Sequence, residues 1–415
     1  MTVIIAGGGI AGLAMGLTLH QIGVPFHILE SVAEPKPLGV GINLQPVAVR
    51  ELFDLGLETQ LSQIGIATQD YGFYTNTGVE IWTEPRGRHA GYKWPQYSVH
   101  RGRLQMALLR AVTARCGPSC ITFAAHVSSY EAHGTGVVVD YIGPNGPHRI
   151  MADLLIGADG IHSKVRAQMY PNQGPPVWGG AIMWRGTTNA APFLGGRSMI
   201  LAGNDTQRFV SYPIFEPDQE TGKSVINWIA ERRIDPKTQL QKEDWNRKVE
   251  TAAFSGEFSD WNFGWIDVPR LIDNVTAVFE YPMIDREPVA SWTDGATTLI
   301  GDAAHATYPV GSSGASQAIL DARILGAAIV AKGATRAAAL DYENRVRPMA
   351  NRVTLANRGN GGPDAIMQMA EDRCGGDYSK LDEMLPLSER QRHADTFKKL
   401  ARTSVEDTNV QASII

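Results

Sequence analysis

A glycine-rich turn between a short apolar strand and a helix lies at the start of the chain. Residues 3–6 form an apolar run, Gly7, Gly9 and Gly12 follow, and apolar residues then recur at helical spacing. This pattern is typical of a unit that binds a dinucleotide, because Gly7 permits the turn, Gly9 lets the backbone approach a pyrophosphate, and Gly12 lets helix and strand pack closely. The helix N-terminus, with Ala11 in its first turn, is expected to face the phosphates.

An acidic residue, Glu30, closes the second predicted strand, residues 26–30. A carboxylate at this position accepts hydrogen bonds from the ribose hydroxyls and repels a 2′-phosphate, so FAD or NAD is favoured over NADP. This unit alone leaves the choice between FAD and NAD open.

Two further motifs lie far along the chain, IGADGIHSKVR at 156–166 and LIGDAAHATYPVGSSGASQAILDA at 299–322. Together with the first turn they make the chain similar to the class A flavin monooxygenases, the para-hydroxybenzoate hydroxylase-like family. Up to about residue 358 the chain resembles most the branch of phenazine hydroxylases that act on 5-methylphenazine-1-carboxylate. Segments such as PLGVGINLQPVAVREL, GGAIMWRG and EYPMIDREP carry this likeness.

The resemblance implies a monooxygenase with FAD as cofactor and NADH or NADPH as reductant. Its implied reaction is hydroxylation of an aromatic or N-heteroaromatic substrate, carboxylated or phenazine-like, with O2 through a flavin C4a-hydroperoxide. The alternatives are a non-hydroxylating FAD oxidoreductase and a non-enzymatic carrier of the same fold. A flavin-dependent halogenase is disfavoured, because residues 264–269 lack the second tryptophan of the halogenase motif.

The resemblance also implies which residues contact FAD. Asp302 would bind the ribityl chain, Asp159 and Gly160 would lie near the pyrophosphate with Arg166 supplying positive charge, and the helix from Gly314 would point at the flavin pyrimidine edge. The implied set is Gly7, Gly9, Ala11, Gly12, Glu30, Val40, Gly41, Arg101, Gln105, Val127, Asp159, Gly160, Arg166, Asp302, Pro309, Gly311, Gly314 and Ala315.

Two residues of the third motif receive separate interpretations. His305 is expected to be a packing and turn residue, with no role in proton transfer. Ser316 stands where many members of the family have an asparagine, so a side-chain contact to the flavin edge is in doubt there.

Candidate substrate residues come from two predicted strands, GAIMWRGTT and RFVSYPIF. Arg185 and Arg208 are candidates for holding a substrate carboxylate, because a guanidinium matches a carboxylate with two hydrogen bonds. Strand periodicity places Arg208 and Tyr212 on one face, where Tyr212 would orient the ring. The alternatives are paired arginines and a core tyrosine. The expected pocket wall comprises Met183, Trp184, Phe209 and Pro309, although each is also a plausible core residue. Asp285 and Arg286 are expected near the nicotinamide or flavin approach, or in a surface ion pair.

The predicted fold class is α/β, with a Rossmann-like FAD-binding lobe interleaved with a sheet-based substrate lobe and followed by C-terminal helices. Residues 1–174 and 291–358 are assigned to the FAD-binding lobe, 175–290 to the substrate lobe, and 359–415 to a helical or partly mobile tail.

Composition excludes other classes of function. A net charge of −5 with dispersed basic residues does not favour nucleic-acid binding. No uninterrupted apolar run reaches the roughly 18 residues that cross a bilayer. The three cysteines have no metal-ligand spacing and are expected to be reduced, with Cys116 and Cys120 as a remote redox-pair alternative. The cofactor strand starts at the N-terminus, so no signal peptide and a cytoplasmic monomer or homodimer are expected.

Overall fold

A six-stranded sheet contains the glycine-rich turn at its centre. The computed structural model describes residues 2–235, 247–358, 362, 364–400 and 404–415. The strand order is β19-β20-β12-β1-β2-β8, and β1 pairs in parallel with both β12 and β2. Carboxyl ends of parallel strands meet at one edge of a sheet, so the segments that follow these strands lie together. The strands are β1 (Val3–Ala6), β2 (Phe26–Leu29), β8 (Ile121–Thr122), β12 (Leu154–Gly157), β19 (Thr293–Asp294) and β20 (Thr297–Leu299).

Four long helices surround this sheet and build the larger hydrophobic core. They are α1 (Ile10–Gln21), α4 (Arg101–Cys116), α8 (Gly314–Lys332) and α9 (Arg336–Asn357). The helices α1 and α8 approach closely, because Gly326 leaves space for the side chain of Thr18. Among the described helices, α8 alone is long and apolar enough to cross a bilayer, and more than half of that stretch is buried in the protein. Its apolar composition is therefore that of a core helix as well.

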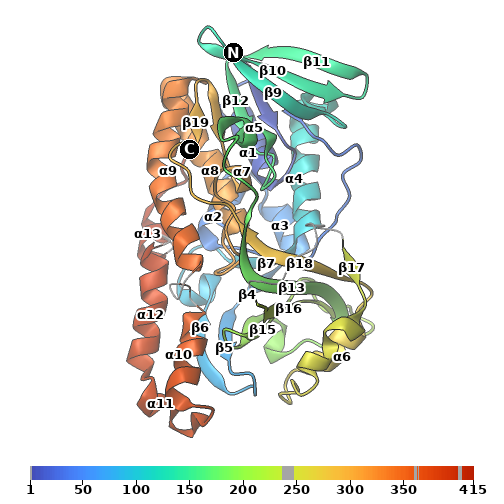
Figure 1. Ribbon diagram of the computed structural model, residues 1–415, viewed down its shortest axis with the longest axis vertical. Coiled ribbons are helices and arrows are strands. Elements are labelled where there is room, and N and C mark those ends of the chain that lie inside the picture. Colours follow the sequence, from blue (N-terminus) through green and yellow to red (C-terminus); the bar gives the residue numbers. More distant parts are fainter. Residues whose placement is uncertain (1, 236–246, 359–361, 363, 401–403) are drawn as a thin grey trace.

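An eight-stranded sheet forms the second lobe below the first (Figure 1). Its order is β17-β18-β13-β16-β15-β14-β5-β6. The strands are β5 (Asp70–Tyr74), β6 (Glu80–Pro85), β13 (Val177–Ala190), β14 (Ser198–Gly203), β15 (Gln207–Pro213), β16 (Ser224–Arg233), β17 (Lys248–Val249) and β18 (Val278–Asp285). The α/β class with interleaved lobes is thus confirmed. One detail is corrected, because β5 and β6 come from the range 1–174 that was assigned entirely to the FAD-binding lobe.

Smaller elements complete the two lobes. Two three-stranded sheets consist of β3 (Gly41–Leu44), β7 (Gln96–His100) and β4 (Gly65–Thr68), and of β9 (His126–His133), β10 (Gly136–Gly143) and β11 (Gly146–Ala152). The shorter helices are α2 (Pro46–Asp54), α3 (Glu58–Ile64), α5 (Lys164–Met169), α6 (Val268–Asp273) and α7 (Asp302–His305). The 3-10 turns η4 (Thr251–Ala253) and η5 (Ser255–Phe258) lie beside α6.

The tail is helical over most of its described length. Its helices are α10 (Ala365–Cys374), α11 (Leu381–Met384), α12 (Leu387–Leu400) and α13 (Val405–Val410). They run along the edge of the substrate lobe and then return to the first lobe (Figure 1). Arg390 donates to the carbonyl oxygen of Ile81, and Lys398 pairs with Glu84, so the tail is joined to β6 by charged side chains.

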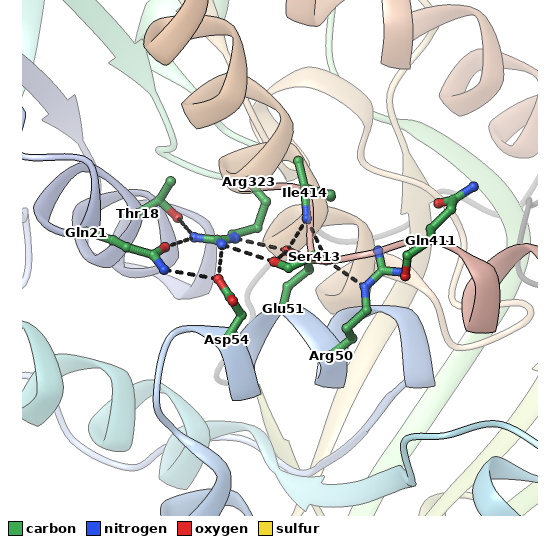
Figure 2. A network of polar contacts seen from close by, with 9 residues as sticks. All are labelled: Thr18, Gln21, Arg50, Glu51, Asp54, Arg323, Gln411, Ser413 and Ile414. Atoms are coloured by element: carbon green, nitrogen blue, oxygen red, sulfur yellow. Dashed lines mark hydrogen bonds and ion pairs between the residues drawn. The ribbon is translucent and has the colours of Figure 1, made fainter.

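A buried charge network joins the chain's last residues to the FAD-binding lobe (Figure 2). Arg323 on α8 is fully buried and donates to Glu51, Gln21 and Asp54 at 3.0, 2.5 and 2.5 Å. Glu51, also fully buried, accepts further hydrogen bonds from Arg50 at 2.8 Å and from the hydroxyl of Ser413 at 3.1 Å. The network therefore holds α1, α2, α8 and the C-terminal residues together.

We expect Arg323→Met to lower the free energy of unfolding by about 3–5 kcal/mol, because the change leaves the buried carboxylate of Glu51 without one of its cations. Urea unfolding, followed by tryptophan fluorescence and circular dichroism, measures this loss. Arg352→Met, at an exposed position on α9, is the control and should change the free energy little. Equal effects of the two substitutions would contradict the stabilising role of the network.

Candidate active site

The turn after β1 has no room for side chains at two of its glycines. A Cβ on Gly12 would lie 1.9 Å from the carbonyl oxygen of Gly7, and one on Gly7 would lie 2.5 Å from the carbonyl oxygen of Ala158. A Cβ on Gly9, in contrast, would meet no described atom within 4 Å. The N–H groups of the first turn of α1, which contains Ala11, therefore adjoin open space, as an anion-binding helix terminus requires.

Glu30 and Gln105 converge on the same turn from different elements. One carboxylate oxygen of Glu30 accepts the N–H of Gly8 at 2.5 Å, and the other accepts that of Val32 at 2.7 Å. Gln105, on α4, donates to the carbonyl oxygen of Gly8 at 3.0 Å. The structure thus brings together two residues that the sequence analysis assigned to FAD binding. Val127 lies buried in β9, and its predicted contact stays a prediction.

Asp159 follows β12 at the same sheet edge. Its Oδ2 accepts the N–H groups of Lys164 at 2.7 Å and Val165 at 3.3 Å, whereas its Oδ1 is buried without a partner among the described residues. Burial raises the pKa of Asp159, although the hydrogen bonds from Ser163, Val165 and Lys164 oppose this shift. An unsatisfied buried oxygen beside a glycine turn suits a ligand that supplies a hydrogen bond.

Arg166, which was predicted to supply positive charge near the pyrophosphate, has its guanidinium engaged inside the protein. Arg166 is 1% exposed, and its guanidinium donates to the carbonyl oxygens of Ala303 and Ala304 at 2.9 and 2.7 Å and to that of Glu287 at 2.7 Å. The side chain therefore stabilises the end of α7 from within the protein, and its spacing from Asp159 gave no sign of these distant partners.

The third motif is organised by Asp321, a residue that sequence reasoning missed. Asp321 is fully buried on α8, and its Oδ2 accepts the N–H of Gly301 at 2.8 Å and lies 2.6 Å from Nε2 of His305. Burial lowers the pKa of His305, but the charge and hydrogen bond of Asp321 outweigh burial, so the net shift is upward. Asp302, next to Gly301, remains exposed at the start of α7. Asp321 thus positions the residue predicted to bind the ribityl chain.

The helix α8 begins at Gly314, as predicted, with Ala315 in its first turn and no side-chain cap at Ser313. The exposed Pro309 and the partly buried Gly311, whose φ is +77°, lie in the turn that leads to it. Within the same helix, Ser316 accepts a hydrogen bond from the N–H of Gln45 at 2.9 Å. The serine therefore orients the segment before α2, which accounts for a hydroxyl at this position.

Backbone atoms of Gly41 connect the lobes. The N–H of Gly41 donates to Oδ1 of Asn227 at 2.7 Å, and its carbonyl oxygen accepts from Arg185 at 3.2 Å. A Cβ at Gly41 would lie 2.6 Å from the ring of Tyr212. The neighbouring carbonyl oxygen of Val40 accepts the N–H of Arg101 at 2.9 Å. The segment predicted to pass the isoalloxazine thus contacts the substrate sheet directly, and Asn227 is a second residue that the sequence analysis missed.

One face of the eight-stranded sheet presents a mixed apolar and polar surface, which we call the substrate platform. We define it by alternate residues of the four central strands: Tyr212, Val210, Arg208, Asn227, Ile229, Glu231, Thr187, Arg185, Met183, Phe279 and Tyr281. An apolar cluster packs at its centre, formed by Ala181, Met183, Val210, Ile229, Tyr281, Met283, Tyr308 and Val310. Met183 and Tyr212 therefore lie on the face predicted for them.

The prediction that Arg208 holds a substrate carboxylate is wrong. Its Nη1 pairs with Asp364 of the tail, its Nη2 pairs with Asp205 at 2.6 Å, and its Nε donates to the carbonyl oxygen of Asn204 at 3.0 Å. Each guanidinium nitrogen is already engaged, so Arg208 connects the platform to the tail.

Trp184 and Phe209 were also assigned wrongly to the pocket wall. They lie on the opposite face of the sheet, in an aromatic core with Trp228 and Phe254. Trp184 stacks on Phe254 with ring centroids 4.6 Å apart, and Phe209 is fully buried. Alternation along a strand gave the relative faces correctly, but it did not reveal which face is turned toward the first lobe.

The C-terminal end of α9 contacts the segment that precedes α8. The Nδ2 of Asn357 lies within hydrogen-bonding distance of the carbonyl oxygens of Tyr308 and Val310, at 3.3 and 3.4 Å. The neighbouring Arg358 pairs twice with the buried Asp285, at 2.7 and 2.8 Å. Arg286 donates to the carbonyl oxygens of Ile161 and Gly174. The side chains of Asp285 and Arg286 are thus both bound by other groups of the protein.

Cys116 and Cys120 are both free thiols. Burial raises the pKa of each, to about 11 for Cys120, and so disfavours the reactive thiolate.

The residues at the junction of the lobes fit FAD. Open space adjoins Gly9. The buried polar atoms without a hydrogen-bond partner among the described residues include Oδ1 of Asp159, Nε of Arg185 and Nδ2 of Asn227. Buried polar groups in proteins are nearly always paired, so groups of this kind at one junction indicate a polar ligand. Glu30 and the N-termini of α1 and α8 supply an acceptor and two positive helix ends.

Comparisons with known proteins agree with this geometry. Residues 1–356 match a family model described as an FAD binding domain. The chain is 41% identical to phenazine 1,6-dicarboxylic acid hydroxylase PhzS from Lysobacter antibioticus, over 86% of this chain and 89% of that protein. It is 29% identical to aurachin C monooxygenase/isomerase from Stigmatella aurantiaca, over 83% and 84%.

Solved structures show the same fold. Klebsiella pneumoniae HpxO, complexed with FAD and uric acid, superposes with a TM-score of 0.74 at 21% identity, covering 98% of this chain and 97% of that chain. The fold, the family match and the relatives agree, and the chain belongs to the FAD-dependent aromatic monooxygenases.

Proposed function

We propose that this monooxygenase hydroxylates a carboxylated, phenazine-like N-heteroaromatic acid that binds on the substrate platform. The observation that carries the proposal is Arg185, whose buried Nε lacks a partner among the described residues and whose neighbours Met183 and Tyr281 are apolar or aromatic. A guanidinium beside an aromatic surface suits a flat ring with a carboxylate. The relative that acts on phenazine 1,6-dicarboxylic acid supports the phenazine class.

FAD supplies the reaction with dioxygen, after NADH or NADPH has reduced it. The chain's own residues bind and orient the substrate. Burial lowers the pKa of Arg185, but a guanidinium retains its charge at neutral pH. Burial raises the pKa of Tyr212 to about 12, although Arg185 opposes this shift. The phenol therefore stays protonated at neutral pH and can donate a hydrogen bond to a ring nitrogen or oxygen.

The apolar centre of the platform would exclude water from the ring, and the arginine would fix the carboxylate at one end. We further propose that the lobes act as assigned above, with residues 175–290 holding the substrate, in a cytoplasmic monomer or homodimer that uses neither nucleic acid nor membrane as a partner. The net charge of −5 and the dispersed basic residues support the proposal that nucleic acid is not a partner.

Oxidation of NADH and NADPH by the FAD-loaded protein tests the function directly. We expect phenazine-1-carboxylic acid or its N-methyl derivative to stimulate oxidation, with a hydroxylated product and little peroxide. Unsubstituted phenazine should stimulate less. Stoichiometric peroxide without hydroxylated product, or no stimulation by any aromatic acid in a panel of phenazine, pyridine and benzoic acids, would contradict the proposal.

Substitution of Arg185 tests the carboxylate site. We expect Arg185→Met to raise the KM of the carboxylated substrate about 10- to 100-fold, because it removes a charged hydrogen bond. The KM of unsubstituted phenazine should change little. Arg197→Met, at an arginine that pairs with Glu216 away from the platform, is the matched control. If Arg185→Met raised the KM of the carboxylated substrate and that of unsubstituted phenazine by the same factor, Arg185 would have another role.

A further inference from the structure

Glu231 is an acidic residue of the substrate platform to which no role has been assigned above. It lies on β16, where cross-strand pairing places it beside Arg208 of β15 and Met183 of β13. Tyr281 of β18 is next in the same row, beside Met183. A carboxyl group therefore adjoins the apolar centre on which the proposed ring would lie.

The rows of the platform give it two chemically different ends. One row contains Tyr212, Asn227 and Thr187, and the row of Glu231 lies four residues further along β16. At about 3.3 Å per residue, the two rows are roughly 13 Å apart. Arg185 extends toward the first end, because it donates to the carbonyl oxygen of Gly41, which lies against Tyr212. Arg185 and Glu231 thus lie toward opposite ends of the apolar centre.

Neutralising Arg208 does not require Glu231. Asp205 and Asp364 already pair with that guanidinium, and its remaining nitrogen donates to the carbonyl oxygen of Asn204. Glu231 makes no hydrogen bond or ion pair with any described residue, although Arg208 and Arg233 attract its charge. Burial raises the pKa of Glu231, and the charge of Arg208 opposes this shift. The residue is nevertheless partly accessible.

A partly accessible carboxyl group without a hydrogen-bond partner among the described residues can accept a hydrogen bond from a ligand. Groups with a shifted pKa cluster at functional sites. A second substrate carboxylate at this end would be repelled by Glu231, whereas an O–H or N–H group would be accepted by it.

Resting on the function proposed above, we propose that Glu231 is a specificity-determining residue, which selects aromatic acids that carry a hydrogen-bond donor on the ring edge remote from the carboxylate. The ligand class is a hydroxylated or aminated N-heteroaromatic monocarboxylic acid. Glu231 accepts a hydrogen bond from the donor on the ring edge, and Arg185 donates hydrogen bonds to the carboxylate at the other end.

Binding of three phenazine acids, read from the absorbance change of the bound FAD at mildly alkaline pH, tests this assignment. The ligands are phenazine-1-carboxylic acid, 6-hydroxyphenazine-1-carboxylic acid and phenazine-1,6-dicarboxylic acid. We expect the wild type to bind the hydroxy acid more tightly than the dicarboxylic acid. Glu231→Gln should weaken binding of the hydroxy acid and strengthen binding of the dicarboxylic acid, each about 10-fold. Binding of phenazine-1-carboxylic acid should change little.

A second variant distinguishes the effect of the negative charge from the effect of side-chain length. Glu231→Asp keeps the negative charge but shortens the side chain, so it should weaken the hydroxy acid without strengthening the dicarboxylic acid. Glu216→Gln, at the exposed carboxylate that pairs with Arg197, should leave all three dissociation constants unchanged. FAD content and the thermal unfolding midpoint of each variant report whether the fold is retained.

The outcomes distinguish the two proposals. If the wild type binds the phenazine acids but the Glu231 variants change all three affinities equally, or change none, the role of Glu231 is overturned and the proposed function stands. If the wild type binds none of them, the proposed function fails, and the assignment of Glu231 fails with it.

Discussion

The backbone of Gly41 connects the two lobes at the candidate active site. Its N–H group and carbonyl oxygen are both bound by side chains of the eight-stranded sheet, Asn227 and Arg185. A Cβ would collide with Tyr212, so the contact depends on glycine. This contact places the start of β3, which belongs to the first lobe, directly on the substrate platform. Gly41 therefore helps to fix the two lobes relative to each other, together with the pairing of Arg358 with Asp285.

The helix α8 contributes to the structure at its N-terminus and near its middle. Its N-terminus lies at the junction of the lobes, and near its middle Asp321 binds the N–H of Gly301 and the ring of His305. Further along, Arg323 joins the buried network of Glu51 and Asp54, which also binds the last residues of the chain (Figure 2). Buried ion pairs and hydrogen bonds hold this helix in place, because its carboxylate and its guanidinium have partners from other elements. The tail thus contributes to the position of the helix that is predicted to point at the flavin.

Local patterns in the sequence predicted the parts of the structure that depend on local chemistry. The glycine turn, Glu30, the start of α8 and the shared face of Arg208 and Tyr212 all follow from spacing and conformational preference. The contacts that the sequence did not predict join distant segments. Arg208 meets Asp364 from the tail, and Arg166 meets carbonyl oxygens more than a hundred residues away. No local pattern reveals such partners, and strand periodicity does not show which face of a sheet is turned toward another lobe. For that reason Trp184 and Phe209 were placed on the wrong face.

A crystal structure of the FAD-loaded protein with phenazine-1-carboxylic acid tests the central claim, that the substrate lies on the platform at the junction of the lobes. The account predicts the ring over Met183, Ile229 and Tyr281, with its carboxylate bound by Arg185. A ring bound on the aromatic face of Trp184 and Phe209, or a carboxylate bound away from Arg185, would contradict it.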